Sequence, residues 1–254
     1  NDLPEAVKSQ VRLFADDCLL YRSVKNQSDY ITLQNDLQKL EEWGNTWGMR
    51  FNASKCYIMS INSKTPYFYQ LSNQVLKIVN QNPYLGVLLS DDMKWGGHIS
   101  KTVKKANSTL AFLRRNLRYC PQSCKRNAYI ALVRSKLEYG AVVWDPHLQQ
   151  DINILERTQR KAARFITRDY RSREPGSMTK MLANLELDPL VSRRKHLRLA
   201  LFYRIAQGDI PALPPSDYLT PIRAKRKIKP RNFDDCLHQR SRGQCCAKHK
   251  GLCS

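Results

Sequence analysis

The feature that most limits the fold is a change in the spacing of apolar residues near residue 98. From there, six apolar residues recur at alternating steps of four and three: Ile99, Val103, Ala106, Leu110, Leu113 and Leu117. This spacing places them on one face of a helix of about six turns. Before residue 98, apolar residues lie in short runs separated by polar or proline-containing breaks. The sequence therefore predicts an α+β fold, with a mixed part over residues 1–96 and an all-helical part over residues 97–210.

Smaller signals fit the same division. Two short apolar runs flank Asp16-Asp17 and predict an antiparallel β-hairpin. Residues 28–47 predict a helix that Ser28 caps and Gly48 ends. Strand-like runs follow at 56–61, 75–79 and 84–89, and further helices are predicted near 122–139, 150–168 and 189–207.

The net charge of +21 lies entirely in the second part. Residues 1–96 carry ten basic and ten acidic residues, whereas residues 97–254 carry the other 33 basic and 12 acidic ones. Such asymmetry favours a polyanion, and nucleic acid first, as the partner of the second part. Four of its cations fall on roughly the opposite helix face to the apolar stripe: Lys101, Lys104, Lys105 and Arg115. The alternatives are an anionic membrane surface or a solvated face that serves only solubility.

Asp16 and Asp17 are candidate metal ligands because both carboxylates would project from one hairpin tip. Mg²⁺ favours oxygen ligands and usually takes one or two protein carboxylates, with phosphates and water completing its shell. Polymerases use two such ions, about 4 Å apart, for nucleotidyl transfer. An isolated Asp-Asp pair is more often a solvated acidic turn, so the pair alone does not indicate a polymerase.

The order of four motifs favours the polymerase. Phe14-Ala15-Asp16-Asp17 is followed by W-G-M-R-F-N-A-S-K-C at 47–56, by Y-L-G-V-L-L-S-D at 84–91, and by L-E-Y-G-A-V-V-W-D-P at 137–146. In this order and at this spacing, the motifs resemble those of reverse transcriptases from non-LTR retrotransposons of the jockey-like or CR1-like type. The resemblance covers residues 1 to about 232.

The resemblance implies a C-terminal fragment of a polymerase palm followed by a thumb, from an RNA-directed DNA polymerase. Its partners would be an RNA template, a DNA primer and deoxynucleotide triphosphates. Asp16 and Asp17 would bind two Mg²⁺ ions, Lys55 would lie near the phosphates of the incoming nucleotide, and the turn Tyr84-Leu85-Gly86 would hold the primer end. The helical region would contact the duplex backbone through its exposed cations. An exposed strand-edge lysine at position 55, and an ordinary strand end at 84–86, stay open as alternatives.

The same resemblance implies an incomplete active site in these 254 residues. The family takes a third carboxylate from a strand upstream of the hairpin, whereas Asp2 and Glu5 are the only acidic residues before Asp16 and neither lies in such a pattern. We therefore expect a piece of a longer protein that has no polymerase activity alone. Two rival hypotheses are a nucleic-acid-binding module without catalysis and a decayed fragment without function.

Residues 211–254 contain proline, charge and cysteine without any period, and we expect this tail to be disordered. Resemblance to the family stops near Asp234, which a frameshift or truncation would explain. Six metal-ligating residues follow: Cys236, His238, Cys245, Cys246, His249 and Cys253. Their spacing fits a zinc site only in part, so unpaired thiols are favoured over zinc.

The Lys/Arg run within 223–231 predicts a nuclear-entry signal or a phosphate-binding patch, with a solvated linker as the alternative. The sequence shows no signal peptide and no apolar run of membrane-spanning length. We accordingly expect an intracellular, nuclear protein that does not bind membranes. The sequence does not indicate an oligomeric state.

Overall fold

The computed structural model describes residues 2–62 and 67–220 of the chain. The chain divides into two compact units, Asn1–Leu201 and Phe202–Ser254. Within the described ranges, no helix is both long enough and apolar enough to cross a membrane. The tail cysteines, the tail histidines and the Lys/Arg run after residue 221 lie outside the described residues, as does most of the predicted tail.

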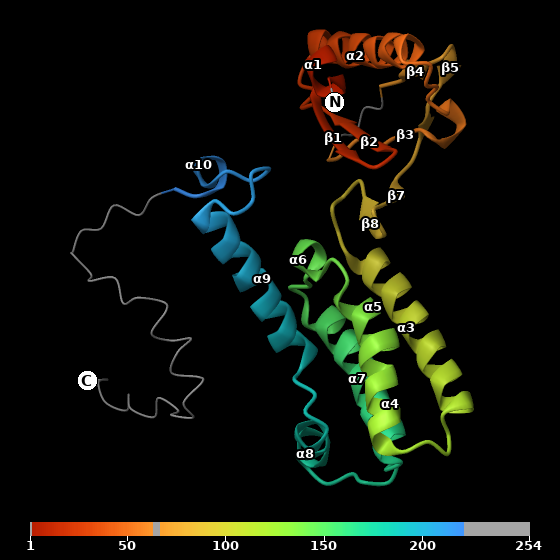
Figure 1. The fold of residues 1–254 in the computed structure, drawn as a ribbon, viewed down its shortest axis with the longest axis vertical. Helices are drawn as coiled ribbons and strands as arrows, with labels where there is room; N and C mark the ends of the chain where they lie inside the picture. The colour runs from red at the N-terminus through yellow and green to blue at the C-terminus, as the bar shows by residue number, and fades with distance from the viewer. Residues whose placement is uncertain (1, 63–66, 221–254) are drawn as a thin grey trace, which may run out of the picture. The chain divides into compact units, whose positions relative to one another are not determined.

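Near its start, the first unit contains the predicted hairpin, which lies against one long helix (Figure 1). Short helix α1 (Leu3–Ala6) leads into β1 (Gln10–Phe14) and β2 (Asp17–Tyr21), and helix α2 (Gln27–Thr46) follows. Leu3, Val11 and Leu40 form the buried contact between these elements. The hairpin is therefore fixed by its apolar face, while its turn stays free for other contacts.

A buried carboxylate fixes the start of β1. Asp36 is 1% exposed and accepts hydrogen bonds from the backbone N–H groups of Lys8 and Ser9, at 3.0 and 2.8 Å. Burial alone would raise the pKa of Asp36, but these hydrogen bonds outweigh it and lower the pKa. The sequence signal for this contact is an aspartate on the apolar face of α2, beside Leu33, Leu37 and Leu40.

The ends of α2 correct one prediction and confirm another. Ser28 does not cap the helix; Asn26 does, because its side chain accepts a hydrogen bond from the backbone N–H of Asp29. The Ser28 hydroxyl donates to the same Asn26 oxygen. Gly48 follows the last turn with a φ of +67°, as predicted for a glycine that ends a helix.

Short strands follow α2, after a 3₁₀ turn over Ala53–Lys55. They form three two-stranded pairs: β3 (Tyr57–Ile58) with β6 (Lys77–Ile78) in parallel, and the antiparallel hairpins β4 (Gln70–Leu71) with β5 (Gln74–Val75) and β7 (Gln81–Tyr84) with β8 (Val87–Ser90). The prediction of a single strand over 84–89 is wrong, because the chain reverses at Leu85-Gly86, where both φ angles are positive.

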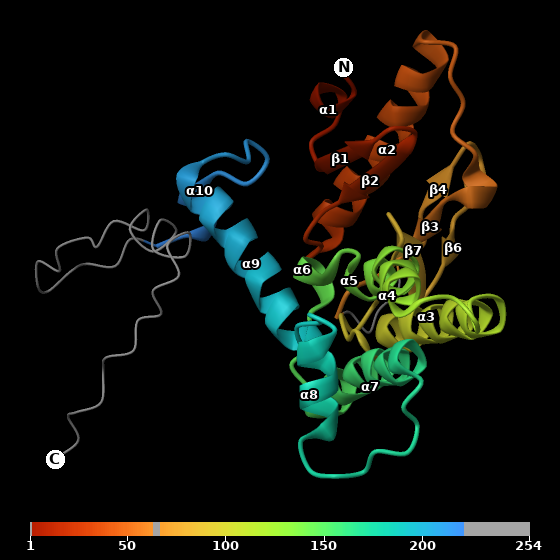
Figure 2. The same ribbon diagram turned by 60° about the horizontal axis from the view of Figure 1, so that its bottom comes forward.

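The rest of the first unit is helical (Figures 1 and 2). Its helices are α3 (Gly96–Asn116), α4 (Gln122–Tyr129), α5 (Ser135–Glu138), α6 (Ala141–Trp144), α7 (Gln149–Thr167), α8 (Ser177–Asn184) and α9 (Leu190–Gln207), which ends in the second unit. A π-helical turn over Ile130–Arg134 joins α4 to α5. In the second unit, the described part ends with α10 (Pro215–Tyr218). The α+β class is confirmed, and α6 and α8 are helices that the sequence analysis missed.

The predicted apolar stripe of α3 is confirmed. Ile99, Ala106, Leu110 and Leu113 are buried, and Val103 and Leu117 pack partly against the same core. Helices α4, α5 and α7 lie against this face of α3 (Figures 1 and 2). The core also contains Val87 of β8, so the second hairpin belongs to the packing of the helical region.

Candidate active site

Asp16 and Asp17 lie together at the tip of the first hairpin. The register pairs Phe14 with Asp17, which leaves Ala15 and Asp16 as the two turn residues. Ala15 has a φ of +52°, the left-handed conformation that tight hairpin turns use and that alanine adopts only at a cost of about 1–2 kcal/mol. Both aspartates are exposed. The hairpin thus presents two adjacent carboxylates to solvent on a short turn.

The second hairpin brings a tyrosine near these carboxylates. Tyr84 is the last residue of β7 and is half-buried. Its pKa is raised, first by burial and then by the negative charges of Asp17 and Cys18. Two turns that are 68 residues apart by number, at Asp16 and at Tyr84, therefore belong to one neighbourhood. The charge of Asp17 thus reaches Tyr84 in the structure, whereas the sequence could only predict each residue separately.

The turn after Tyr84 is held from outside by Tyr139. The Tyr139 hydroxyl donates a hydrogen bond of 2.9 Å to the carbonyl of Leu85. Gly86 has a φ of +81°, and a Cβ at this position would lie 3.0 Å from Cε1 of the Tyr139 ring. Glycine is required here both by the backbone conformation and by the close approach of the ring. Sequence reasoning missed this role of Tyr139, which lies 54 residues away along the chain.

Replacing Gly86 by alanine should therefore cost more than the backbone conformation alone explains. We expect the left-handed φ to contribute about 1–2 kcal/mol to the loss of unfolding free energy, with a further loss from the contact with Tyr139. Gly48→Ala is the matched control, because Gly48 has a φ of +67° and nothing within 4 Å of the added Cβ. Urea unfolding of both variants measures the difference. Equal losses would contradict a tight contact between Gly86 and Tyr139.

A buried histidine supports the same hairpin from the helical side. His98 of α3 accepts a hydrogen bond at Nδ1 from the backbone N–H of Leu88, at 3.0 Å, and its ring lies 5.1 Å from that of Trp144. Burial lowers the pKa of His98, and the charges of Lys101 and Lys105 lower it further. An acceptor at Nδ1 requires a neutral ring, so this histidine has a structural role in fixing β8.

Lys55 lies at the end of the 3₁₀ turn rather than on a strand edge. It is exposed, and Asn52 stabilises the turn by accepting a hydrogen bond from the backbone N–H of Ser54. Among the residues that the structure describes, Lys55 has no ion-pair partner. Its amine is therefore free to contact a phosphate, and its role near the nucleotide stays a prediction.

The four predicted backbone-binding cations all lie exposed on α3. Lys101, Lys104 and Lys105 share about one turn, whereas Arg115 lies on the same face about 15 Å further along the axis. In residues 2–62 and 67–220, none of the four forms an ion pair. This face therefore carries uncompensated positive charge, as a phosphate-binding surface requires.

The motif over residues 137–146 connects the hairpin to the helices. Besides Tyr139, it contains Trp144, which is fully buried, and two acidic residues that pair with α9. Glu138 pairs with Arg193, and Asp145 pairs with Arg194 at 2.7 Å. The sequence analysis used this motif only to identify a family, and its structural role was not predicted.

The ligand atoms at the hairpin tip are of the type that a divalent cation prefers, but among the described residues there are too few carboxylates for a complete two-metal site. Carboxylate oxygens are the ligands that Mg²⁺ prefers, and Asp16 and Asp17 supply two carboxylates. Within the described ranges, no group of three or more Asp, Glu, His or Cys side chains could hold a metal ion. The residues present thus fit part of a two-metal site.

Comparison with known proteins first identifies the protein family that the first part of the chain resembles. Residues 1–97 match the family described as reverse transcriptase (RNA-dependent DNA polymerase). The matched range contains the Asp16-Asp17 hairpin, Lys55 and the Tyr84-Leu85-Gly86 turn. No solved structure matches the chain significantly.

Individual proteins similar to this chain come from mobile elements of Drosophila melanogaster. The chain is 26% identical over 168 residues to the probable RNA-directed DNA polymerases from transposon X-element and from transposon BS, and 24% identical over 165 residues to that from mobile element jockey. These alignments cover 62–63% of this chain and 18% of each relative, so the chain spans about a fifth of the relatives it matches. The predicted resemblance to reverse transcriptases of jockey-like non-LTR retrotransposons is confirmed.

Proposed function

We propose that the chain is the later part of the palm, together with the thumb, of an RNA-directed DNA polymerase that copies a mobile element. The observation that carries the proposal is the hairpin with Asp16 and Asp17 exposed at its tip. The similarity of residues 1–97 to reverse transcriptases supports it. In this proposal, residues 1–96 act as palm and residues 97–210 as thumb.

In the intact polymerase, Asp16 and Asp17 would hold Mg²⁺. The two ions would activate the primer 3′-hydroxyl for attack and neutralise the charge that develops on the leaving pyrophosphate. The short turn serves this task because it fixes both carboxylates at one point. Lys55 would contact the triphosphate of the incoming deoxynucleotide and donate a proton to the departing pyrophosphate.

The turn Tyr84-Leu85-Gly86 would hold the primer end near the two carboxylates. It is suited to this role because it is fixed on two sides: Tyr139 binds the Leu85 carbonyl, and His98 binds the N–H of Leu88. A turn held in this way keeps its backbone in place when a strand end lies against it. The pKa of Tyr84 is raised first by burial and then by the charge of Asp17.

The exposed cations of α3 would contact the backbone of the RNA template–DNA primer duplex. Lys101, Lys104 and Lys105 stand close together and without ion-pair partners among the described residues. Such contacts position a duplex without reading its sequence. We also propose that the protein acts in the nucleus, with the Lys/Arg run of residues 223–231 as the entry signal.

Binding of a blunt RNA–DNA duplex tests this assignment. Replacing Lys101, Lys104 and Lys105 by glutamine should weaken binding and reduce the slope of log K against log salt by up to about 2.7, since each lost phosphate contact removes about 0.9. Fluorescence anisotropy at several salt concentrations measures both effects. The matched control replaces Arg157, Arg160 and Lys161 by glutamine, which removes the same charge from the exposed side of α7.

Comparing the salt slopes of the two triple variants shows whether the duplex binds on α3 or is attracted only by net charge. A smaller salt slope in the α3 variant alone would support duplex contacts on α3. Equal losses in both variants would contradict a defined binding face and indicate attraction to net charge. If the chain restored to full length binds the duplex but does not extend a primer, the result would favour a binding module without enzymatic activity.

A further inference from the structure

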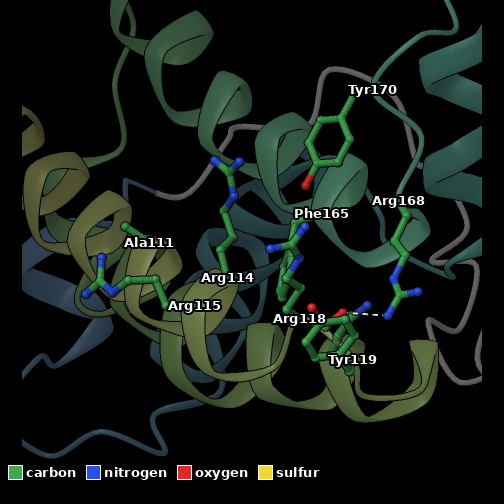
Figure 3. Close-up of a pocket in the computed structure, with 9 residues that line it drawn as sticks. Ala111, Arg114, Arg115, Arg118, Tyr119, Phe165, Arg168 and Tyr170 are labelled. Atoms are coloured by element: carbon green, nitrogen blue, oxygen red, sulfur yellow. Dashed lines mark hydrogen bonds between the residues drawn. The ribbon is translucent and has the colours of Figure 1, made fainter.

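A cavity lies at the far end of α3 from the predicted duplex-binding lysines. Its walls come from three places: the end of α3 and the following turn, α4, and the end of α7 with the following loop (Figure 3). Its volume is about 960 Å³, which is within the usual range for small-molecule pockets. Lys104 and Arg114 are about 15 Å apart along the helix, so the cavity is separate from the α3 lysine cluster.

The cavity is lined by five cations and by no acidic residue: Arg114, Arg115, Arg118, Lys125 and Arg168. Among the residues that the structure describes, none of the five takes part in an ion pair. The nearest acidic neighbour in sequence, Asp169, is already bound by the backbone N–H groups of Arg171 and Ser172. Like charges that converge without a counter-charge are unfavourable, so the site is suited to an anion.

Lys125 strengthens this inference because it is buried. It is 1% exposed, its ammonium lies 5.5 Å from the centre of the Phe165 ring, and it lines the cavity. No hydrogen bond joins its side chain to another of the described residues, and its nitrogen is not among the fully buried atoms that lack a partner, so the amine is accessible from the cavity. Burial lowers the pKa of Lys125, and the charge of Arg168 lowers it further. A bound anion would supply the missing partner for this amine.

Two tyrosines stand at opposite ends of the cavity (Figure 3). Arg118 lies 5.5 Å from the ring centre of Tyr119, and Arg114 lies 5.7 Å from that of Tyr170. Tyr119 is 83% exposed, so most of its ring is open to a ligand. Arginines beside exposed aromatic rings are typical of sites for unpaired nucleotides, where phosphates meet the cations and bases stack on the rings.

We propose that this cavity binds an unpaired nucleotide of a nucleic-acid strand, with phosphate groups at Arg114, Arg118, Lys125 and Arg168 and the base against Tyr119. Arg168 is held in place for this role, because its guanidinium donates to the backbone carbonyl of Arg118. The site would hold a single-stranded segment away from the duplex. The proposal does not depend on catalysis by Asp16 and Asp17, nor on duplex binding by the α3 lysines.

The test measures binding of the full 254-residue chain to a labelled single-stranded RNA of twelve uridines and to a blunt RNA–DNA duplex. Arg114→Gln with Arg118→Gln should weaken single-strand binding by about tenfold or more and duplex binding by less than twofold. Tyr119→Leu should weaken single-strand binding by about fivefold or more, as expected for the loss of one stacked base. Because Tyr119 is largely exposed, this variant keeps the fold, which a thermal unfolding curve checks.

The matched control is Arg157→Gln with Arg160→Gln, which removes two exposed charges from α7 outside the cavity. Equal weakening by this control, or unchanged single-strand binding in both cavity variants, would overturn the proposal. Uridine monophosphate should compete with the RNA at lower concentration than inorganic phosphate; equal competition would overturn the assignment to a nucleotide. Failure of the α3 triple variant to affect duplex binding would instead count only against the α3 assignment.

Discussion

Replacing Asp16 by asparagine should lower primer extension on an RNA template by at least about 10³-fold, or about 4 kcal/mol in transition-state stabilisation, once the missing upstream part is restored. The reason is that the hairpin tip supplies two carboxylates and each is expected to bind a catalytic ion directly. An amide keeps the size of the side chain but loses its charge. Restoration is achieved by joining the chain to the upstream part of the jockey polymerase, which it resembles. Steady-state extension rates measure the effect.

Two comparisons make this result specific. Asp209→Asn is the matched control, because Asp209 is exposed and lies far along the sequence from the hairpin; it should retain full activity. The 254-residue chain alone should show no extension, since the described residues hold no complete metal site. Substantial extension by the Asp16→Asn variant would contradict a role in metal binding. Extension by the chain alone would contradict the proposed incompleteness of the site.

The second large effect concerns stability and the ion pair between Asp145 and Arg194. Arg194 is completely buried, its Nε lies 2.7 Å from Oδ1 of Asp145, and the Asp145 side chain is 11% exposed. Its two Nη atoms have no partner among the described residues, so Asp145 provides its main counter-charge. Asp145→Asn should therefore lower the unfolding free energy by roughly 3–5 kcal/mol, because it leaves a buried charge unpaired. Urea unfolding followed by two probes measures the loss.

The control uses the other cation on the same carboxylate. Arg198 lies 3.0 Å from Oδ2 of Asp145, but its side chain is 53% exposed. Arg198→Gln should cost no more than about 1 kcal/mol, as is usual for exposed ion pairs. A loss below about 1 kcal/mol for Asp145→Asn would contradict the buried pair as a main source of stability. A large loss for Arg198→Gln would show that solvent does not screen this site.

Features that depend on local spacing could be predicted from the sequence. The α3 stripe was predictable because each apolar residue follows the previous one by three or four positions, and the first hairpin because two apolar runs flank two acidic residues. The cap of α2 was predicted two residues too late, since Asn26 and Ser28 are both good capping residues and only geometry decides between them.

Contacts between distant residues could not be predicted in this way. Tyr139 binds Leu85 across 54 positions, and Asp36 binds Ser9 across 27, and no periodic pattern relates these pairs. The cavity shows the same difficulty. Periodicity identified Arg115 on one helix, whereas Arg168 reaches the same cavity from another helix end. The predicted roles of Lys55 and of the Tyr84-Leu85-Gly86 turn stay predictions.

The packing of Val87 has a consequence for which segments of this chain can be exchanged as a unit. The match to the reverse transcriptase family covers residues 1–97, yet Val87 is buried in the core of the helices, and Tyr139 and His98 bind the hairpin that contains it. A recombination event at residue 97 would separate the hairpin from the side chains shaped to receive it. Hairpin and helices therefore form one packing unit, and an exchange of segments that keeps this packing needs its junction before β7.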